Sequence, residues 1–330
     1  MNVIICDKLK EDDERYFRFG WRTPYQELES LGWKTVDQKE ISGTISEFFL
    51  TTFGELPRLL LFWNSAMVET FDLIYRNIDD LIIHKWIKCI SLDDLHKDKH
   101  REPRFESIIL KNFDYVVITY PNVFPKFFKT ISPNKIISCP HSINNKFITV
   151  FNGNPVNQVL LSGCLTKKYY PFRYRVYELS QIKINAKTRK YPIALLKNLS
   201  YVKANHNNYG YNYLKYLNKY LACITSSSTE KLPYVIAKFF EIPASGSLLL
   251  AEDKYIKEPL HELGFIDGEN YLSVNFDNLE ERLFFVTNPS NREYIDKIRR
   301  NGYEFVWNNH TLMHRVKAIH EKLCTEAVPN

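Results

Sequence analysis

The segment from Lys238 to Leu250 combines a carboxylate with a turn of small residues. Glu241 stands in a helix-like stretch, and Ser245, Gly246 and Ser247 form the turn before an apolar run. A carboxylate can accept hydrogen bonds from the hydroxyls of a ribose or a sugar. The backbone N–H groups of such a turn, with a glycine that lacks a side chain, leave room for a phosphate. The segment therefore indicates a nucleotide or sugar site, and an ordinary helix-to-strand turn with an exposed glutamate is the alternative.

A histidine and two carboxylates follow an apolar run in the first half of the chain. The run at residues 87–90 leads into Asp93, Asp94 and, two positions later, His96. Residues that follow a strand of a parallel sheet lie at the edge where ligands bind. A histidine or carboxylate there could position or deprotonate an acceptor hydroxyl, and His141 could contact a phosphate or the acceptor. As an alternative, either aspartate could cap a following helix.

Several catalytic patterns are missing from the sequence. It contains no Walker A loop, no HExxH, no GxSxG and no zinc signature, and no GxGxxG follows the first apolar run. A dinucleotide-dependent oxidoreductase is therefore not expected. The Asp93-Asp94 pair is not a DxD motif, so we expect no divalent metal and no other cofactor. The six cysteines form no CxxC pair, which predicts neither a zinc site nor a disulfide framework and favours a reducing compartment.

Length and charge narrow the class of protein. A chain of 330 residues predicts two domains, because domains usually contain ~100–200 residues. The net charge of +6 is mild and spread along the chain, so we do not expect a nucleic-acid partner. The start at Met1–Cys6 is too short for a signal peptide, and runs such as Leu59–Trp63 are too short to span a membrane. We expect a cytoplasmic protein whose membrane contact, if any, is peripheral.

Strand-like and helix-like runs alternate along the chain. Val3–Cys6 reads as a buried strand, Thr23-Pro24 as the start of a helix that ends near Gly32, and residues 33–36 as the next strand. This βαβ unit predicts a parallel sheet. Further strands are expected at residues 59–63, 87–90, 115–119, 135–138, 159–162, 221–225 and 247–251, with a helix at 68–76 and a charged loop at 97–104.

Two helices are expected near the end of the chain. Ser290 and Glu293 have the spacing of a capping box, which predicts a helix that stops near Arg300, with Gly302 as the residue after its end. A last helix is expected at about residues 311–323.

The elements together predict an α/β fold class with two doubly wound, Rossmann-like domains. The turn-rich segment Asn152–Pro155 marks the expected boundary. Ligands of such sheets bind at the carboxyl ends of the strands, near the point where the strand order reverses. We expect an N-terminal domain at residues 1–152, a C-terminal domain at 153–308, and a C-terminal helix at 309–330 that packs back on the N-terminal domain.

The region around Glu241 resembles the C-terminal domain of the GT-B-fold glycosyltransferases, and among them the CgeB-like branch of the group 1 families. The likeness covers about residues 155–320. It is carried by Phe240-Glu241-Ile242-Pro243-Ala244-Ser245-Gly246, by Gly264-Phe265-Ile266-Asp267-Gly268 before Tyr271, and by His310-Thr311 with Arg315. The sequence departs at one position, since these families often carry another glutamate where Pro233 stands here.

The resemblance implies a phosphate site at the start of the second domain. Residues 159–163 are similar to the first strand of that domain, where the family has a glycine against the donor pyrophosphate and basic residues soon after. Here the glycine would be Gly163, and the candidate cations are Lys167, Lys168 and Arg173. Cations and N–H donors stabilise the charge that a diphosphate leaving group gains. For the two lysines, a solvated loop is the alternative.

We therefore expect a glycosyltransferase that transfers a sugar from a nucleotide-diphosphate sugar to a glycan or another hydroxyl acceptor. The resemblance implies a donor on the second domain, an acceptor on the first, and in most such families retention of the anomeric configuration. One alternative is a sugar-nucleotide epimerase of the same fold. The other, which Pro233 favours, is a non-catalytic protein that binds a nucleotide or a sugar.

Overall fold

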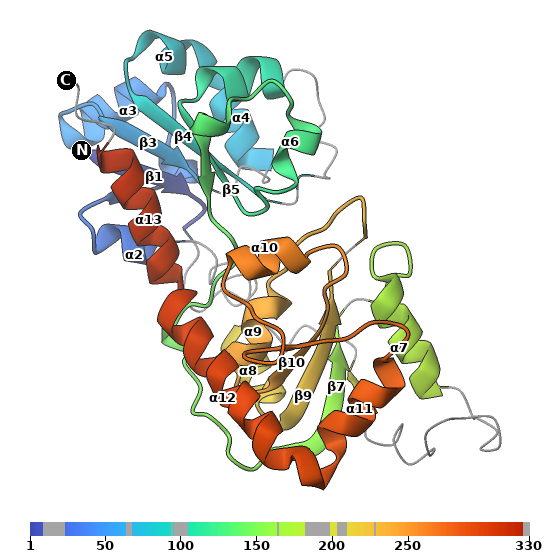
Figure 1. Ribbon diagram of the computed structural model, residues 1–330. Helices are drawn as coiled ribbons and strands as arrows, with labels where there is room; N and C mark the ends of the chain where they lie inside the picture. The colour runs from blue at the N-terminus through green and yellow to red at the C-terminus, as the bar shows by residue number, and fades with distance from the viewer. Residues whose placement is uncertain are drawn as a thin grey trace. The chain divides into compact units, whose positions relative to one another are not determined.

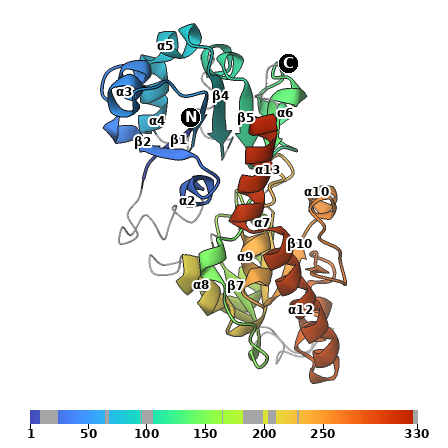
Figure 2. The same ribbon diagram turned by 90° about the vertical axis from the view of Figure 1, so that its left-hand side faces the viewer.

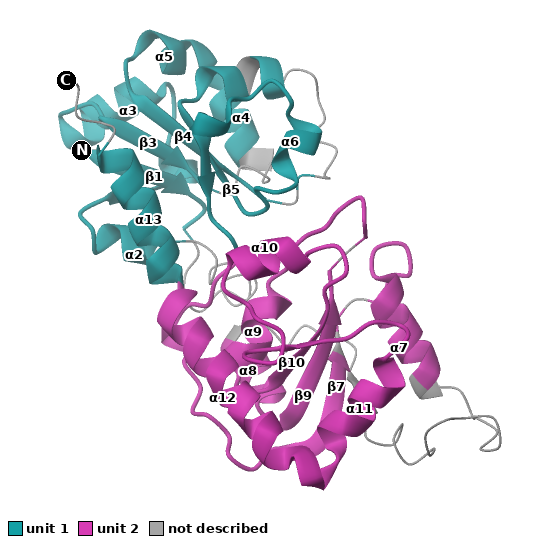
Figure 3. Cartoon of the chain, viewed as in Figure 1, with its two compact units in different colours: residues 1–140, 312–330 teal, residues 141–311 magenta. Residues whose placement is uncertain are grey.

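The chain folds into two compact units (Figure 3). The computed structural model describes residues 1–8, 24–63, 68–93, 95, 105–163, 165–181, 199–202, 210–227 and 229–325. Unit 1 comprises residues 1–140 and 312–330, and unit 2 comprises residues 141–311. We expected boundaries at residues 152 and 308, whereas the compact units divide at 140 and 311.

The two ends of unit 2 are joined to each other. The backbone N–H of Ile143 donates a hydrogen bond to the carbonyl of His310 over 2.9 Å. Ile143 and Thr311 also form an isolated parallel bridge. The first and last segments of unit 2 therefore lie next to each other.

Unit 1 is built on a parallel sheet of six strands in the order β2-β1-β3-β4-β5-β6 (Figure 1). Val3 of β1 lies between Lys34 of β2 and Leu60 of β3 in the ladder. Apart from the edge strand β2, the strands are mainly short apolar runs, as is typical of parallel strands covered on both faces. All six strands expected in this part of the sequence are present: β1 (Asn2–Cys6), β2 (Lys34–Asp37), β3 (Leu59–Phe62), β4 (Ile87–Leu92), β5 (Tyr115–Ile118) and β6 (Ile136–Ser138).

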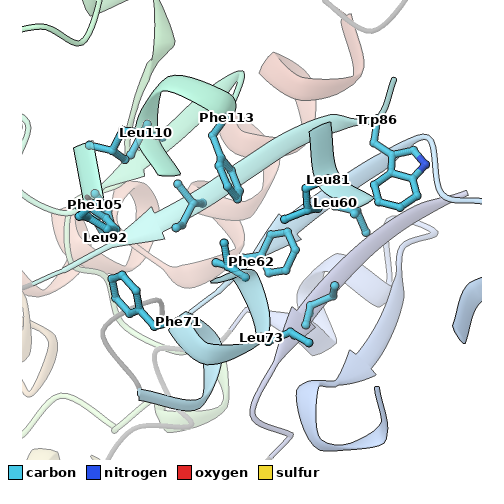
Figure 4. Packing of buried hydrophobic residues seen from close by; sticks show 14 of the residues in the cluster. Leu60, Phe62, Phe71, Leu73, Leu81, Trp86, Leu92, Phe105, Leu110 and Phe113 are labelled. Carbon is cyan, nitrogen blue, oxygen red and sulfur yellow. The ribbon is translucent and has the colours of Figure 1, made fainter. Parts of the chain in front are cut away.

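One face of this sheet packs against helices that follow its first strands. Thr44 and Glu47 form a capping box at the start of α3 (Ile45–Phe53), which the sequence reading missed. Helix α4 (Val68–Arg76) lies where it was expected, and α5 (Ile78–Ile83) follows it. Aromatic side chains from β3, α4 and the segments after β4 fill the core between them, including Phe62, Phe71, Phe105 and Phe113 (Figure 4).

The other face of the unit 1 sheet is covered by two helices that are far apart in the sequence. Leu28 of α2 (Tyr25–Glu29) and Val316 and Ile319 of α13 (Leu312–Thr325) share one core with strand residues. The indole N–H of Trp33 also donates to Nδ1 of His320 over 2.9 Å. The final helix of the chain is therefore part of unit 1.

Unit 2 contains a second parallel sheet in the order β11-β10-β9-β7-β8 (Figure 1). Strands β9 and β10 pair in register along the whole of β10, and Leu250 of β10 lies opposite Ile224 of β9. The three strands expected from the sequence are present. The bounds are β7 (Val156–Ser162), β8 (Leu199–Val202), β9 (Tyr220–Ser226), β10 (Leu248–Glu252) and β11 (Leu272–Ser273).

Helices cover both faces of this second sheet. On one face, α7 (Pro171–Gln181) and α11 (Leu279–Thr287) pack through apolar residues such as Phe172, Val176 and Leu283. Helices α8 (Gly210–Leu217) and α9 (Lys238–Ala244) lie on the other face, where α12 (Arg292–Asn309) packs along α9 and β10 (Figure 2). A shorter helix, α10 (Lys257–Glu262), follows β10.

Helix α12 differs from its prediction at both ends. The N-cap is Asn291, without a side-chain cap, so the capping box predicted from Ser290 and Glu293 is wrong. The helix also continues through Gly302 to Asn309. Gly302 serves close packing there, because a Cβ at this position would lie 2.6 Å from the carbonyl oxygen of Asn270.

This contact generates a prediction about stability. In an open helix Gly→Ala would stabilise the fold by up to about 1 kcal/mol, but overpacking costs about 1–3 kcal/mol. We expect Gly302→Ala to lower the melting temperature, because the added methyl group meets backbone that cannot move away easily. The control is Gly153→Ala, where nothing lies within 4 Å of the added atom. An unchanged or raised melting temperature for Gly302→Ala would contradict this packing.

Candidate functional site

The strand order of unit 2 places a switch point beside β7. The chain passes from β7 to β8 on one side and then returns to β9 on the other side. Ligands of doubly wound sheets bind at the carboxyl ends of the strands where the order reverses. Helices that follow these strands begin at the same edge. We call the ends of β7, β9 and β10, with the first turns of α7 and α9, the carboxyl edge of unit 2.

Gly163 follows β7 directly and brings two cationic side chains together. Its φ of +106° lies in the left-handed region, which disfavours residues with a side chain. A Cβ at this position would lie 2.7 Å from Cε of Lys238 and 3.0 Å from Nη1 of Arg173. The backbone conformation therefore favours glycine at this position, and the ends of the two cationic side chains pass over it.

Arg173 lies in the first turn of α7 and is buried. Its Nε donates a long hydrogen bond of 3.4 Å to Oγ of Ser226, the last residue of β9. Its guanidinium lies 3.5 Å from the centroid of the Tyr170 ring. The aromatic face and the hydroxyl orient the guanidinium without neutralising its charge.

Lys238 is the first residue of α9, and its ammonium group lies 4.3 Å from the centroid of the Tyr213 ring. Nζ also donates a hydrogen bond to the hydroxyl of Tyr213. Burial works against the charged form, but Tyr213 and Glu241 outweigh it, so the pKa of Lys238 is raised above its ordinary value. The ammonium is charged at neutral pH. Glu241 lies in the same first turn and is half-buried.

Two carboxylates stand at the end of β10 in different environments. Asp253 accepts hydrogen bonds of 2.8 Å from the hydroxyls of Tyr271 and Ser273. Glu252 is buried, and its carboxylate makes no hydrogen bond or ion pair with the described residues. Burial, reinforced by the neighbouring charge of Asp253, raises the pKa of Glu252 to about 7. Glu252 is thus a carboxyl group that changes charge near neutral pH.

Three of the eight expected donor residues lie at the carboxyl edge, and the two expected lysines lie in the segment between β7 and α7. Gly163, Arg173 and Glu241 lie at this edge, as described above. Lys167 and Lys168 are exposed, and their ammonium groups lie 5.4 and 5.3 Å from the ring centroids of Tyr174 and Tyr169.

The Ser245-Gly246-Ser247 turn lies at the opposite edge of the sheet. It connects the end of α9 to the start of β10, whereas the cations surround the other end of both elements. The hydroxyl of Ser245 donates to the carbonyl of Ile242 over 2.6 Å, and that of Ser247 donates to the carbonyl of Leu217 over 2.7 Å. The carbonyl of Gly246 accepts a bond of 3.0 Å from Arg299. The structure therefore does not bring this turn together with Gly163, and we do not include it in the proposed site.

The expected acceptor residues are only partly described. Asp94, His96 and the charged loop at 97–104 lie outside the described residues. Asp93 follows β4 and is half-buried, and His141 is buried at the start of unit 2. Among the described residues there is no group of three or more metal-ligating side chains and no helix long and apolar enough to cross a membrane.

The sequence reading missed Lys238, Ser226 and Glu252. A signal was available for each of them. A lysine in the first turn of a helix is unfavourable next to the positive end of the helix dipole, so its presence suggests another role. Ser226 and Glu252 are polar residues that end apolar strands, which is the position where ligands of parallel sheets bind.

The environment of Glu252 generates a prediction about pH. Because its pKa is raised in the folded state, the folded protein holds this proton more tightly than the unfolded chain. The contribution of Glu252 to the free energy of unfolding is therefore fully present below about pH 4.5 and is lost as the pH rises to about 7. We expect Glu252→Gln to be more stable than the parent protein at pH 8, by roughly 1–3 kcal/mol, with a smaller difference at pH 5.

Thermal melting of both proteins from pH 5 to pH 8 measures this difference. The matched control is Glu258→Gln, which makes the same change at an exposed position of α10. A stability difference that does not vary with pH would contradict the raised pKa.

Comparison with known proteins supports the fold. Residues 183–321, less than half of the chain, match a family model described as glycosyl transferase-like. No curated protein sequence matches the chain.

Solved structures match over nearly the whole chain. A glycosyltransferase from Rickettsia africae has 13% identity and a TM-score of 0.57, with 100% of this chain and 99% of that chain covered. A sucrose-phosphate synthase from Thermosynechococcus elongatus has 12% identity and a TM-score of 0.59, with coverages of 99% and 100%. HepE from Anabaena, solved with UDP, has 10% identity and a TM-score of 0.61, with coverages of 98% and 100%. With its two Rossmann-like units, the chain therefore has the GT-B fold of glycosyltransferases, and residues 183–321 form a glycosyl transferase-like region.

Proposed function

We propose that this protein is a glycosyltransferase that binds a nucleotide-diphosphate sugar at the carboxyl edge of unit 2 and transfers the sugar to a hydroxyl acceptor. The observation that carries the proposal is the convergence of two cations, Arg173 and Lys238, on Gly163 at the switch point. A diphosphate is the ligand group that best matches two adjacent cations. The structures of HepE with UDP and with UDP-glucose are consistent with such a donor.

The two cations would act on the leaving group. As the bond between the sugar and the diphosphate breaks, negative charge grows on the diphosphate oxygens. Arg173 and Lys238 are already oriented by Tyr170, Ser226 and Tyr213, so they can stabilise this charge with little reorganisation. These residues carry the positive charge that the departing diphosphate needs, and we therefore propose a reaction that does not require a metal ion.

The other proposed roles concern hydroxyl groups. Glu241, one turn from Lys238 in α9, would accept hydrogen bonds from the ribose hydroxyls of the donor. The acceptor would bind at the carboxyl edge of the unit 1 sheet, where Asp93 follows β4. Asp93, or His96 three residues later in the sequence, would position the attacking hydroxyl and take up its proton.

Removal of the Lys238 charge tests the donor site. We expect Lys238→Ala to weaken the binding of UDP or GDP, whichever the parent protein binds, by about 10–100-fold, because a charged hydrogen bond contributes about 1.5–3 kcal/mol. Isothermal titration calorimetry measures this change. Lys238→Arg should restore part of the affinity, and Lys257→Ala, which removes an exposed lysine of α10, should leave it unchanged. Equal affinities for Lys238→Ala and the parent protein would exclude the proposed diphosphate site.

An activity assay separates sugar transfer from other uses of the same site. We expect release of the nucleoside diphosphate from its sugar conjugate to accelerate when a hydroxyl acceptor from a glycan panel is added. Release or epimerisation at the same rate without an acceptor would contradict transfer and would instead indicate an epimerase or a hydrolase. Donor binding with no turnover over the whole panel would indicate a non-catalytic binding protein.

A further inference from the structure

Glu252 lies on the same face of the unit 2 sheet as the residues that hold Arg173. It is the register partner of Ser226 in the neighbouring strand β9. Paired residues of adjacent strands point to the same face, and such strands lie about 4.8 Å apart. Ser226 accepts the hydrogen bond from Arg173. The Glu252 carboxyl is therefore one strand away from the proposed diphosphate site, on the side opposite β7.

Among the described residues, no group donates a hydrogen bond to the carboxyl oxygens of Glu252, whereas both oxygens of its neighbour Asp253 accept one. The Glu252 residue is only 5% exposed, and within the described part of the chain nothing donates a hydrogen bond to its side chain. Asp253, the next residue, has both oxygens occupied by the hydroxyls of Tyr271 and Ser273. The buried hydroxyl of Ser227, whose N–H lies 3.5 Å from the carbonyl of Glu252, also has no partner among the described residues.

A carboxyl group of a largely buried residue that accepts no hydrogen bond from the described residues fits a ligand that brings hydrogen-bond donors to it. The charged groups that act on Glu252 are Asp253 and Lys254 on the same segment. No described cation forms an ion pair with Glu252, which leaves its oxygens available for neutral donors such as hydroxyls.

We propose that Glu252 accepts hydrogen bonds from hydroxyl groups of the transferred sugar and so determines which sugar the protein selects. This inference rests on the proposed function above. The diphosphate itself carries no donors at neutral pH, and Glu241 in α9 is placed for the ribose. The remaining donor-rich part of a nucleotide sugar is the sugar that is transferred.

The test compares each nucleoside diphosphate with its sugar conjugate. Binding of UDP and UDP-glucose, and of GDP and GDP-mannose, is measured by calorimetry for the parent protein, Glu252→Gln and Glu252→Asp, below their melting temperatures. For the pair that the parent protein binds, we expect Glu252→Gln to weaken binding of the conjugate about tenfold and to leave the free diphosphate within about twofold. Glu252→Asp, whose carboxylate is set back by one methylene group, should also lose conjugate affinity.

The matched control is Asp253→Asn, which removes the same charge one residue along. Because its carboxylate is already occupied within the fold, Asp253→Asn should not change the ratio of the two affinities, even if it lowers the melting temperature. Equal losses for diphosphate and conjugate in Glu252→Gln, or no loss for either, would overturn the sugar contact and leave the donor site standing. Absence of any binding by the parent protein would overturn both proposals.

Discussion

The placement of two like charges side by side is the constraint on which the carboxyl edge of unit 2 depends. The side chains of Arg173 and Lys238 both pass over Gly163, although two neighbouring cations repel each other. Each is held by an aromatic face, Tyr170 for the arginine and Tyr213 for the lysine. Such faces attract a cation without cancelling its charge. The aromatic contacts therefore leave the positive charge of both side chains in place.

The two edges of the same sheet satisfy their polar groups in different ways. At the amino edge, Ser245, Ser247 and the buried Arg299 donate their hydrogen bonds to backbone carbonyls of the protein itself. At the carboxyl edge, the buried side chains of Ser227 and Glu252 have no partner among the described residues. The amino edge therefore meets its hydrogen-bonding capacity within the protein, whereas the carboxyl edge leaves part of that capacity unused by the described residues.

Much of the fold could be predicted from the sequence, because parallel strands are short apolar runs that stand out between polar segments. The positions of β1, β3 and β10 follow directly from that pattern. Gly163 and Arg173 were predicted as site residues through a resemblance, and the structure places them beside each other. The Ser245–Ser247 turn was expected at the site because serine and glycine suit a phosphate loop, but sequence pattern alone does not tell which edge of a sheet a turn occupies. Gly302 illustrates the same limit, since a glycine that permits close packing looks identical in sequence to one that ends a helix.

The hydrogen bond from Ile143 to His310 has a consequence for how this protein can evolve. Because the backbone at the beginning of residues 141–311 is hydrogen-bonded to the backbone at their end, this segment forms an insertion within the chain of unit 1. Insertions of this kind are tolerated when their two ends lie close together. Recombination could therefore exchange residues 141–311 as one unit, and with them the proposed donor site, while the strand order of the unit 1 sheet stays the same.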